Sequence, residues 1–196
     1  MMSDTGDSRG CTRSPRGTEK YLSAVTIGER KPLNGTIHLA PYDPRCPALY
    51  TQLANRIRAA LCEQVLLLEH VGSTSVPGLS AKPVIDIVLA VADSADECSY
   101  APPLEREGFV LRIREPNWLE HRLFKTPDTD GNLHVFSAGT EEIRRMLAFR
   151  DWLRTHEADR LRTKKQSARS QRKPGSTFRI TLMQNQNSFR KYWPAH

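Results

Sequence analysis

Most of the residue types that could do chemistry lie in one stretch, EHVGSTSVPGLSAKPVIDIVLAV, at positions 69–91. Gly72 permits a tight turn and a close approach of the backbone to a ligand. It is followed by three hydroxyl side chains, Ser73, Thr74 and Ser75. Backbone amides and hydroxyls gathered in such a turn can face the oxygens of a phosphate group. The stretch is therefore a candidate site for a phosphorylated ligand.

One acidic residue, Asp86, interrupts the apolar run that ends this stretch. An unpaired buried carboxylate is costly, so Asp86 needs a partner such as a metal ion or a basic side chain. Two interpretations stay open. In the first, Asp86 is a metal ligand or general base, and Lys82 adds positive charge next to a bound phosphate. In the second, the segment is a serine-rich turn, and Asp86 accepts backbone hydrogen bonds or pairs with Lys82.

The elements that must position these residues follow from hydrophobic spacing. Residues 45–64 predict a helix because their leucine and isoleucine positions fall on one helical face. Residues 140–162 predict a second helix, with Thr140 as its cap. A short helical piece ending at Gly108 is also predicted, together with strands at 65–72, 82–91, 110–115, 120–125 and 132–138. The candidate turn therefore connects two strands, and the second is expected to be buried on both faces.

The two ends of the chain differ in composition from its middle. Residues 1–30 are rich in Ser, Thr, Gly and Arg, which predicts a disordered leader. Apolar periodicity also stops near residue 163. Residues 157–196 contain ten lysines and arginines against two acidic residues, a net charge of +8, so the remaining chain carries −1. The basicity of this protein, +7 overall, therefore belongs to its C-terminal segment.

Several classes of protein are not indicated by the sequence. No apolar run approaches the roughly 20 residues that cross a bilayer, so no membrane partner is expected. The N-terminal residues lack the apolar core of a secretory signal, and we expect a cytoplasmic location. The cysteines have wide, irregular spacing without a cluster typical of metal sites, and we expect reduced thiols at Cys11, Cys46, Cys62 and Cys98.

Five motifs in a fixed order, APYDP, EHVGSTSVPGLSAKPVIDI, GF, NLHVF and LAFRDWLR, resemble the GrpB family, a group within the nucleotidyltransferase superfamily. The resemblance covers about residues 38–162. It implies an α/β or α+β fold of the nucleotidyltransferase kind, with a mixed β-sheet flanked by helices. It also divides the chain into a leader at 1–30, a GrpB-like domain at 31–162 and a basic, poorly ordered tail at 163–196.

The resemblance further implies how the site would work. Gly72 and Ser73 would hold the phosphates of a nucleotide, and carboxylates would bind Mg²⁺ for attack of a hydroxyl on phosphorus. Active transferases usually carry a second carboxylate two residues from the first, on the same face of the strand. This chain has valine at both such positions around Asp86. Further ligands would therefore come from later strands, and the expected metal set is Asp86, Glu120 and His134, with His121 in the same region.

Two functions follow from this pattern. The first is a nucleotidyltransferase-like protein that binds a nucleotide or another phosphorylated small molecule and transfers a nucleotidyl group to an acceptor. The alternative is a non-catalytic binding or scaffold protein that keeps the fold without the pair of metal carboxylates. Neither the acceptor, the base of the nucleotide nor the oligomeric state can be read from the residues.

The C-terminal segment has two interpretations of its own. The favoured hypothesis is a shifted reading frame or a degenerate end, because the family resemblance stops near residue 162. A nucleic-acid partner is the less favoured one, supported by basic residues interleaved with aromatic side chains that could stack on bases, namely Phe178, Phe189, Tyr192 and Trp193.

Overall fold

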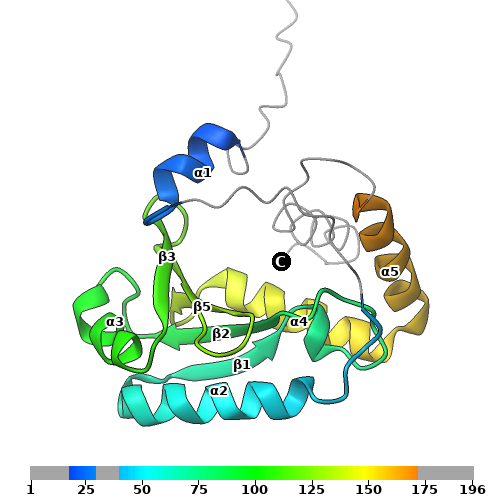
Figure 1. Cartoon of the computed structure of the whole chain (residues 1–196), viewed down its shortest axis with the longest axis horizontal. Helices are drawn as coiled ribbons and strands as arrows, with labels where there is room; N and C mark the ends of the chain where they lie inside the picture. The colour runs from blue at the N-terminus through cyan, green and yellow to red at the C-terminus, as the bar shows by residue number, and fades with distance from the viewer. Residues whose placement is uncertain (1–17, 30–39, 172–196) are drawn as a thin grey trace, which may run out of the picture.

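The computed structural model describes residues 18–29 and 40–171, and Figure 1 shows how their elements are arranged. Helices are labelled α, short 3₁₀ helices η and strands β. In chain order they are α1 (Glu19–Val25), α2 (Cys46–Leu61), η1 (Cys62–Gln64), β1 (Leu67–Val71), η2 (Ser73–Ser75), β2 (Ile85–Val91), α3 (Glu97–Arg106), β3 (Val110–Glu115), β4 (His121–Lys125), β5 (Gly131–Ser137), α4 (Glu141–Thr155) and α5 (Glu157–Gln171).

The strands form one mixed sheet in the order β1-β2-β5-β4-β3. β1 and β2 are antiparallel, β2 and β5 are parallel, and β5, β4 and β3 follow as antiparallel neighbours. The parallel pair needs a long crossover, which here contains α3, β3 and β4. The expected class is thereby confirmed: a mixed β-sheet flanked by helices, in the α+β sense.

The central strand β2 separates two apolar layers, because successive side chains of a strand point to opposite faces. Ile87 and Leu89 pack with α2 and α3 on one face. Val88 and Ala90 pack with α4 on the other. Figure 1 accordingly places α2 and α4 on opposite sides of β1 and β2. Asp86 shares the face of Val88 and Ala90, at the end of β2 where β1 leads into η2.

The helices and strands predicted from hydrophobic spacing are present near their expected bounds, with one exception. The helix expected at 140–162 is divided at His156 into α4 and α5. Thr140 does precede α4, but its hydroxyl donates to the carbonyl oxygen of Ser137 at 2.6 Å and caps no helical amide. The predicted capping bond is therefore wrong, because the hydroxyl is used by the turn that precedes the helix.

The prediction of a disordered leader over residues 1–30 is wrong for residues 18–29, because these include α1. Thr26 forms a bridge with Ile113 at the outer edge of β3, and the Ile27 amide donates to the Arg112 carbonyl oxygen at 2.8 Å. The Tyr21 hydroxyl donates to Glu115 Oε1 at 2.7 Å. Backbone pairing with a sheet edge does not depend on apolar composition, so composition could not reveal it. Residues 1–17 lie outside the described part.

The expected boundary near residue 162 is also wrong, because α5 continues to Gln171. The last helix therefore crosses the point where apolar periodicity stops. A continuous helix there counts against the hypothesis of a shifted reading frame. Residues 172–196, including the aromatic side chains proposed for stacking, lie outside the described residues.

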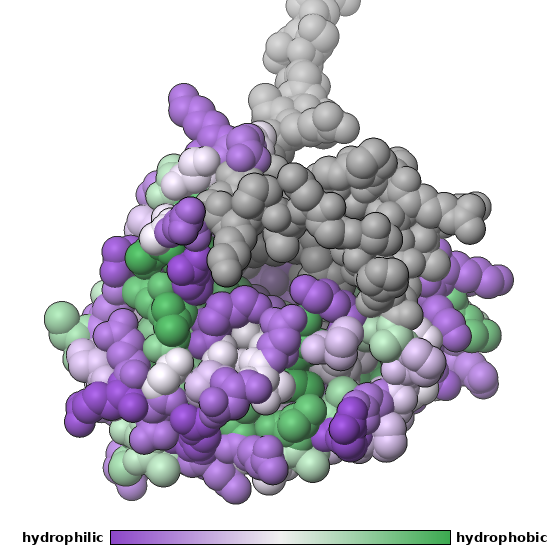
Figure 2. Space-filling view, viewed as in Figure 1, coloured by the Kyte–Doolittle hydropathy of each residue, from purple (hydrophilic) through white to green (hydrophobic). Residues whose placement is uncertain are grey.

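The surface combines polar and apolar residues. On the face shown in Figure 2, hydrophilic residues prevail at the periphery, with smaller groups of hydrophobic residues between them. The most exposed large hydrophobic side chains come from four separate segments, at Leu66, Val110, Leu119 and Leu161. Within residues 18–29 and 40–171, every helix is too short or too polar to cross a bilayer.

The packing of β2 gives a direct test of this fold. Ile87 is fully buried between β1 and β5, so Ile87→Ala should lower the free energy of unfolding by about 2–5 kcal/mol. Leu66→Ala is the control, because this leucine is 56% exposed and its loss should change the value by about 0.5 kcal/mol or less. Urea denaturation of both variants would measure the difference, and equal losses would contradict the described core.

Candidate functional site

The turn after β1 and the carboxylate on β2 are in direct contact. Val71 pairs with Asp86 across the antiparallel ladder, so the next residue, Gly72, lies beside the acidic side chain. Gly72 has φ +72°, in the left-handed region that favours glycine. A methyl group added to Gly72 would lie 2.5 Å from Asp86 Oδ2. Any side chain at this position would displace the carboxylate, so the register of two strands explains why glycine is needed.

Asp86 is buried, and its partners come from β5. Asn132 is its neighbour in the parallel ladder and donates from Nδ2 to Asp86 Oδ1 at 2.7 Å. His134 Nε2 lies 3.9 Å from the same oxygen. Lys82 does not pair with Asp86 among the described residues, and its Nζ lies 3.7 Å from Asp130 Oδ2 instead. The interpretation in which Asp86 and Lys82 form an ion pair is therefore wrong.

A chain of hydrogen bonds from His70 through Thr74 to the Val84 carbonyl oxygen fixes the shape of the turn. The Thr74 hydroxyl donates to the carbonyl oxygen of Val84 at 2.8 Å, which uses its only proton. His70 Nε2, 3.2 Å from the same hydroxyl, must therefore be the protonated ring nitrogen. His70 also stacks on Tyr50 of α2, with ring centroids 4.9 Å apart. Burial lowers the pKa of His70 to about 4, against the charge of Asp86, which acts to raise it.

Helix α4 holds the turn from the other side. The Ser75 hydroxyl donates to the Gly72 carbonyl oxygen at 2.6 Å, closing the turn. Arg154 donates from Nε and Nη2 to the Ser75 carbonyl oxygen at 3.0 and 2.9 Å. One helical turn earlier, Arg150 donates to the His70 carbonyl oxygen at 3.0 Å and to Glu69 Oε2 at 2.7 Å. The two arginines in LAFRDWLR thus attach α4 to both ends of the turn.

Of the three hydroxyls singled out in the sequence, Ser73 alone is left for a ligand. Thr74 and Ser75 are buried and bonded to the backbone, as described above. Ser73 is half-buried, and its hydroxyl forms no hydrogen bond with residues 18–29 or 40–171. The bonds within η2 run from the Ser75 amide to Gly72 and from the Val76 amide to Ser73. They leave the amides of Ser73 and Thr74 unused by the turn itself.

A row of titratable side chains leads away from Asp86 across the sheet. His134 Nδ1 lies 3.1 Å from His121 Nε2 on β4. His121 Nδ1 in turn lies 2.6 Å from Glu115 Oε2 at the end of β3. His121 is 0% and Glu115 1% exposed, whereas His134 is 18% exposed. The row thus begins in the protein interior and ends next to Asp86.

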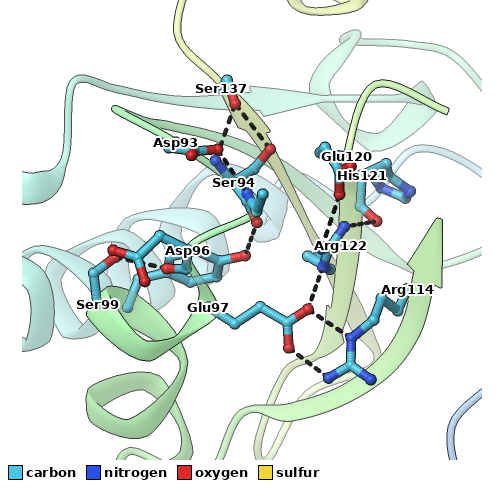
Figure 3. Close-up of polar contacts among 12 residues, drawn as sticks. Asp93, Ser94, Asp96, Glu97, Ser99, Arg114, Glu120, His121, Arg122 and Ser137 are labelled. Atoms are coloured by element: carbon cyan, nitrogen blue, oxygen red, sulfur yellow. Dashed lines mark hydrogen bonds and ion pairs between the residues drawn. The ribbon is translucent and has the colours of Figure 1, made fainter. Parts of the chain in front are cut away.

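Glu120 does not join Asp86 and His134. Its Oε2 lies 3.0 Å from Arg122 Nη2, and Arg122 also bonds to Glu97 of α3, as Figure 3 shows. Because Arg122 and His134 occupy opposite faces of the sheet, Glu120 is held on the α3 side. The structure therefore brings together Asp86 and His134 from the expected metal set, and separates Glu120 from them.

The donor set does not fit a magnesium ion of the kind found in two-carboxylate sites. Mg²⁺ prefers oxygen ligands in octahedral geometry, usually including one or two carboxylates. Asp86 is a single carboxylate, and one of its oxygens already accepts from Asn132. Within the described residues, no group of three or more His, Cys, Asp and Glu side chains could hold a metal ion. No chemical step is therefore assigned to a metal here.

Sequence reasoning selected His134 and His121 but missed Asn132, Glu115 and the two arginines of α4. Asn132 and His134 alternate in NLHVF, and period two places them on one face, but their approach to Asp86 depends on the parallel pairing of β2 with β5. The pairing of Glu115 with His121 depends on a hairpin register that begins at the end of β3. The i, i+4 spacing of Arg150 and Arg154 is the sequence signal that could have predicted the contacts of α4 with the turn.

Comparison with known proteins gave consistent matches. The family model described as GrpB protein matches residues 36–192. A protein of Halalkalibacterium halodurans, named only as a UPF0157 protein, is 62% identical over 147 residues, which is 75% of each chain. The crystal structure of the conserved protein GrpB from Enterococcus faecalis matches with a TM-score of 0.66 and 28% identity, covering 80% of this chain and 100% of that one.

One further match is to part of a longer protein. A dephospho-CoA kinase of Mycobacterium tuberculosis is 35% identical over 117 residues, which is 57% of this chain and 26% of the kinase. The family match to residue 192 also corrects the expected end of the resemblance near residue 162, because the family model continues through the basic segment.

The contact between Gly72 and Asp86 predicts an asymmetry between two glycines. Gly72 and Gly78 both have positive φ, so alanine should cost each about 1–3 kcal/mol of backbone strain. Only at Gly72 would the new methyl group meet Asp86, because nothing lies within 4 Å of the corresponding position at Gly78. Gly72→Ala should therefore lower the free energy of unfolding more than Gly78→Ala does. Chemical denaturation measures both, and similar losses would contradict the contact.

The buried His70 predicts how stability depends on pH. Because the pKa of His70 is about 4 in the folded protein and the ordinary histidine value is 6.5, the unfolded chain binds a proton more readily between these values. The free energy of unfolding should fall as pH drops from 6.5 to 4, by up to about 3 kcal/mol from this residue. His70→Gln, which keeps a donor for Thr74 but does not titrate, should show a smaller fall. The same slope in both proteins would rule out this origin.

Proposed function

Because this chain belongs to the GrpB family, whose model matches residues 36–192, we propose that it binds a nucleotide or another phosphorylated small molecule at the turn of Gly72 and Ser73. The observation that carries the proposal is the contact between Gly72 and Asp86. In this contact a turn whose Ser73 hydroxyl has no hydrogen-bond partner among the described residues lies directly beside a buried carboxylate. Amides and hydroxyls donate to phosphate oxygens, whereas a carboxylate accepts from a hydroxyl.

The two halves of the site would therefore take different parts of one ligand. A phosphate group would lie against the Ser73 hydroxyl and the amides of Ser73 and Thr74. Asp86 carries a negative charge that repels phosphate, so the ligand would turn a hydroxyl group toward it, such as a hydroxyl of a ribose. This division favours a ligand that carries both phosphate and sugar, as a nucleotide does.

The relationship to a dephospho-CoA kinase suggests a ligand to include in the first screen. A segment similar to this chain is part of a protein with that name, and dephospho-CoA is itself a phosphorylated derivative of a nucleoside. The similar segment is a quarter of the kinase, so the kinase activity is not transferred to this chain. Dephospho-CoA and CoA are useful probes beside the ribonucleoside triphosphates.

A non-catalytic binding or scaffold role is the second candidate, and one observation favours it. The residues two positions from Asp86, Val84 just before β2 and Val88 within it, are buried valines where active transferases usually carry a second carboxylate. A protein of this kind would bind the same ligand at the same turn without transferring any group. The two candidates therefore share the binding site and differ only in turnover.

Binding is the first property to measure. Isothermal titration calorimetry with ATP, GTP, CTP, UTP, CoA and dephospho-CoA should show binding of at least one ligand to the full chain. Ser73→Ala should weaken that binding about tenfold, because a hydrogen bond to a charged group contributes about 1.5–3 kcal/mol. Ser99→Ala is the matched control, since this exposed serine of α3 bonds only to the Asp96 carbonyl oxygen.

Each titration is run with EDTA and again with Mg²⁺, because no group of three or more His, Cys, Asp and Glu side chains among the described residues could hold a metal ion. Affinity for the protein should be similar in both conditions once the binding of Mg²⁺ to the nucleotide is included. Equal affinities of wild type and Ser73→Ala, with folding intact, would contradict binding at this turn. Lack of binding across the whole panel would contradict the proposed ligand class.

A further inference from the structure

The geometry of the row from Glu115 to Asp86 indicates which atom donates and which accepts in each of its hydrogen bonds. Glu115 Oε1 accepts a hydrogen bond from the Tyr21 hydroxyl, and Glu115 Oε2 lies next to His121 Nδ1. With Glu115 ionised, His121 Nδ1 must be the donor to it. A neutral His121 then has a lone pair on Nε2, and His134 Nδ1 must donate to it across 3.1 Å. The remaining nitrogen, His134 Nε2, is left with a lone pair that points toward the site.

This arrangement selects the less common form of a neutral imidazole. A free imidazole side chain in water carries its proton mainly on Nε2, so His134 is expected to hold the other tautomer only because His121 accepts from Nδ1. His134 is also the one member of the Glu115, His121 and His134 series that is partly exposed, and its Nε2 lies 3.9 Å from Asp86 Oδ1. A proton arriving at this nitrogen would be attracted by the Asp86 carboxylate.

We propose that His134 is the general base of this site, and that His121 and Glu115 are positioning residues that keep its Nε2 free and stabilise its charged form. The inference rests on the proposed function, because it needs a phosphorylated ligand at the neighbouring turn. It deepens that function by assigning a reaction that does not route a proton through a metal ion.

The reaction would be the attack of a hydroxyl group on the phosphorus of a bound nucleotide. The O–H bond of an alcohol or water breaks, and its proton goes to His134 Nε2. The oxygen forms a bond to phosphorus, and the phosphoanhydride bond breaks with its electron pair leaving on the departing pyrophosphate. General base assistance of this kind typically contributes about 10²–10⁴-fold to a rate.

His121 and Glu115, the buried pair linked by a hydrogen bond to His134 Nδ1, can stabilise the positive charge that this step creates on His134. After protonation at Nε2, the Nδ1 proton of His134 can move to His121 Nε2 along their hydrogen bond. The positive charge then lies between two carboxylates, with Glu115 on one side and Asp86 on the other. Either position of the proton leaves every ring nitrogen of the row with a suitable partner, so the charge is accepted without rearrangement of the sheet.

The charged and titratable groups around His134 are few among the described residues. Asp86 faces it from β2 and His121 from β4, with Glu115 behind His121 on β3 and Tyr21 reaching Glu115 from α1. Lys82 is bonded to Asp130, and Glu120 is bonded to Arg122. Asp86 and His121 are thus the titratable side chains that contact His134 within residues 18–29 and 40–171.

The first test is the tautomer of His134 in the unliganded full chain, measured by nitrogen-15 NMR of histidine-labelled protein at pH 7.5. The expected result is a protonated Nδ1 and an unprotonated Nε2. In the double variant Glu115→Gln with His121→Phe, which removes the buried charge together with its partner, His134 should change to the form protonated on Nε2. A wild-type His134 that is already protonated on Nε2 would overturn the proposal.

The second test is turnover, with γ-phosphate-labelled ATP, GTP, CTP and UTP and with water, glycerol and glucose as hydroxyl acceptors. His134→Gln should lower the rate of pyrophosphate release about 100-fold or more, while the dissociation constant of the nucleotide changes little. Nucleotide binding by wild type without any release would overturn the base role and leave the binding site intact. A lack of binding would instead remove the proposed function, while the tautomer measurement needs no ligand.

Discussion

The contact of Gly72 with Asp86 is the constraint on which the rest of the site depends. It follows from one register, the pairing of Val71 with Asp86, which leaves no room for a side chain between turn and carboxylate. A shift of β1 by one residue would turn Asp86 toward a different neighbour and move the apolar residues of the strand to the other face. The same register that builds the core therefore also builds the site.

The surroundings of this contact divide into groups that hold the site and groups that remain free to act. The hydroxyls of Thr74 and Ser75 donate to backbone carbonyl oxygens, the His70 ring bonds to the Thr74 hydroxyl, and Arg154 fixes the turn to α4. Hydroxyl and imidazole groups can bind ligands, but these hydrogen bonds of the side chains are made within the protein. The hydroxyls of this sequence thus largely shape the loop, and Ser73 is the exception, since its hydroxyl forms no hydrogen bond with residues 18–29 or 40–171.

Hydrophobic spacing was sufficient for the class of fold, because β2 is apolar on both faces and α2 is apolar on one. It was also sufficient to select the Gly72 turn and Asp86, since a lone acid in a buried strand is unusual. It could not place Glu120, whose carboxylate is drawn to Arg122 on the opposite face. Strand pairing between distant segments decides such questions, and pairing is not encoded in the spacing of either strand alone. Hydrophobic spacing also did not predict α1, because the segment that follows this helix is held by backbone pairing with the edge of β3.

The missing second carboxylate and the row of histidines are best understood together. A metal ion in a transferase neutralises negative charge and lowers the barrier to losing a proton from the attacking hydroxyl. Here the position of a second acid is taken by an apolar valine, and the polar side chains beside Asp86 come from β5 instead. In the proposed reaction, His134 would accept a proton where a carboxylate pair would have held a metal, and His121 with Glu115 would keep its Nε2 available. A site built in this way would use an extra proton as its positive charge, so it could act on a phosphorylated ligand with a single carboxylate.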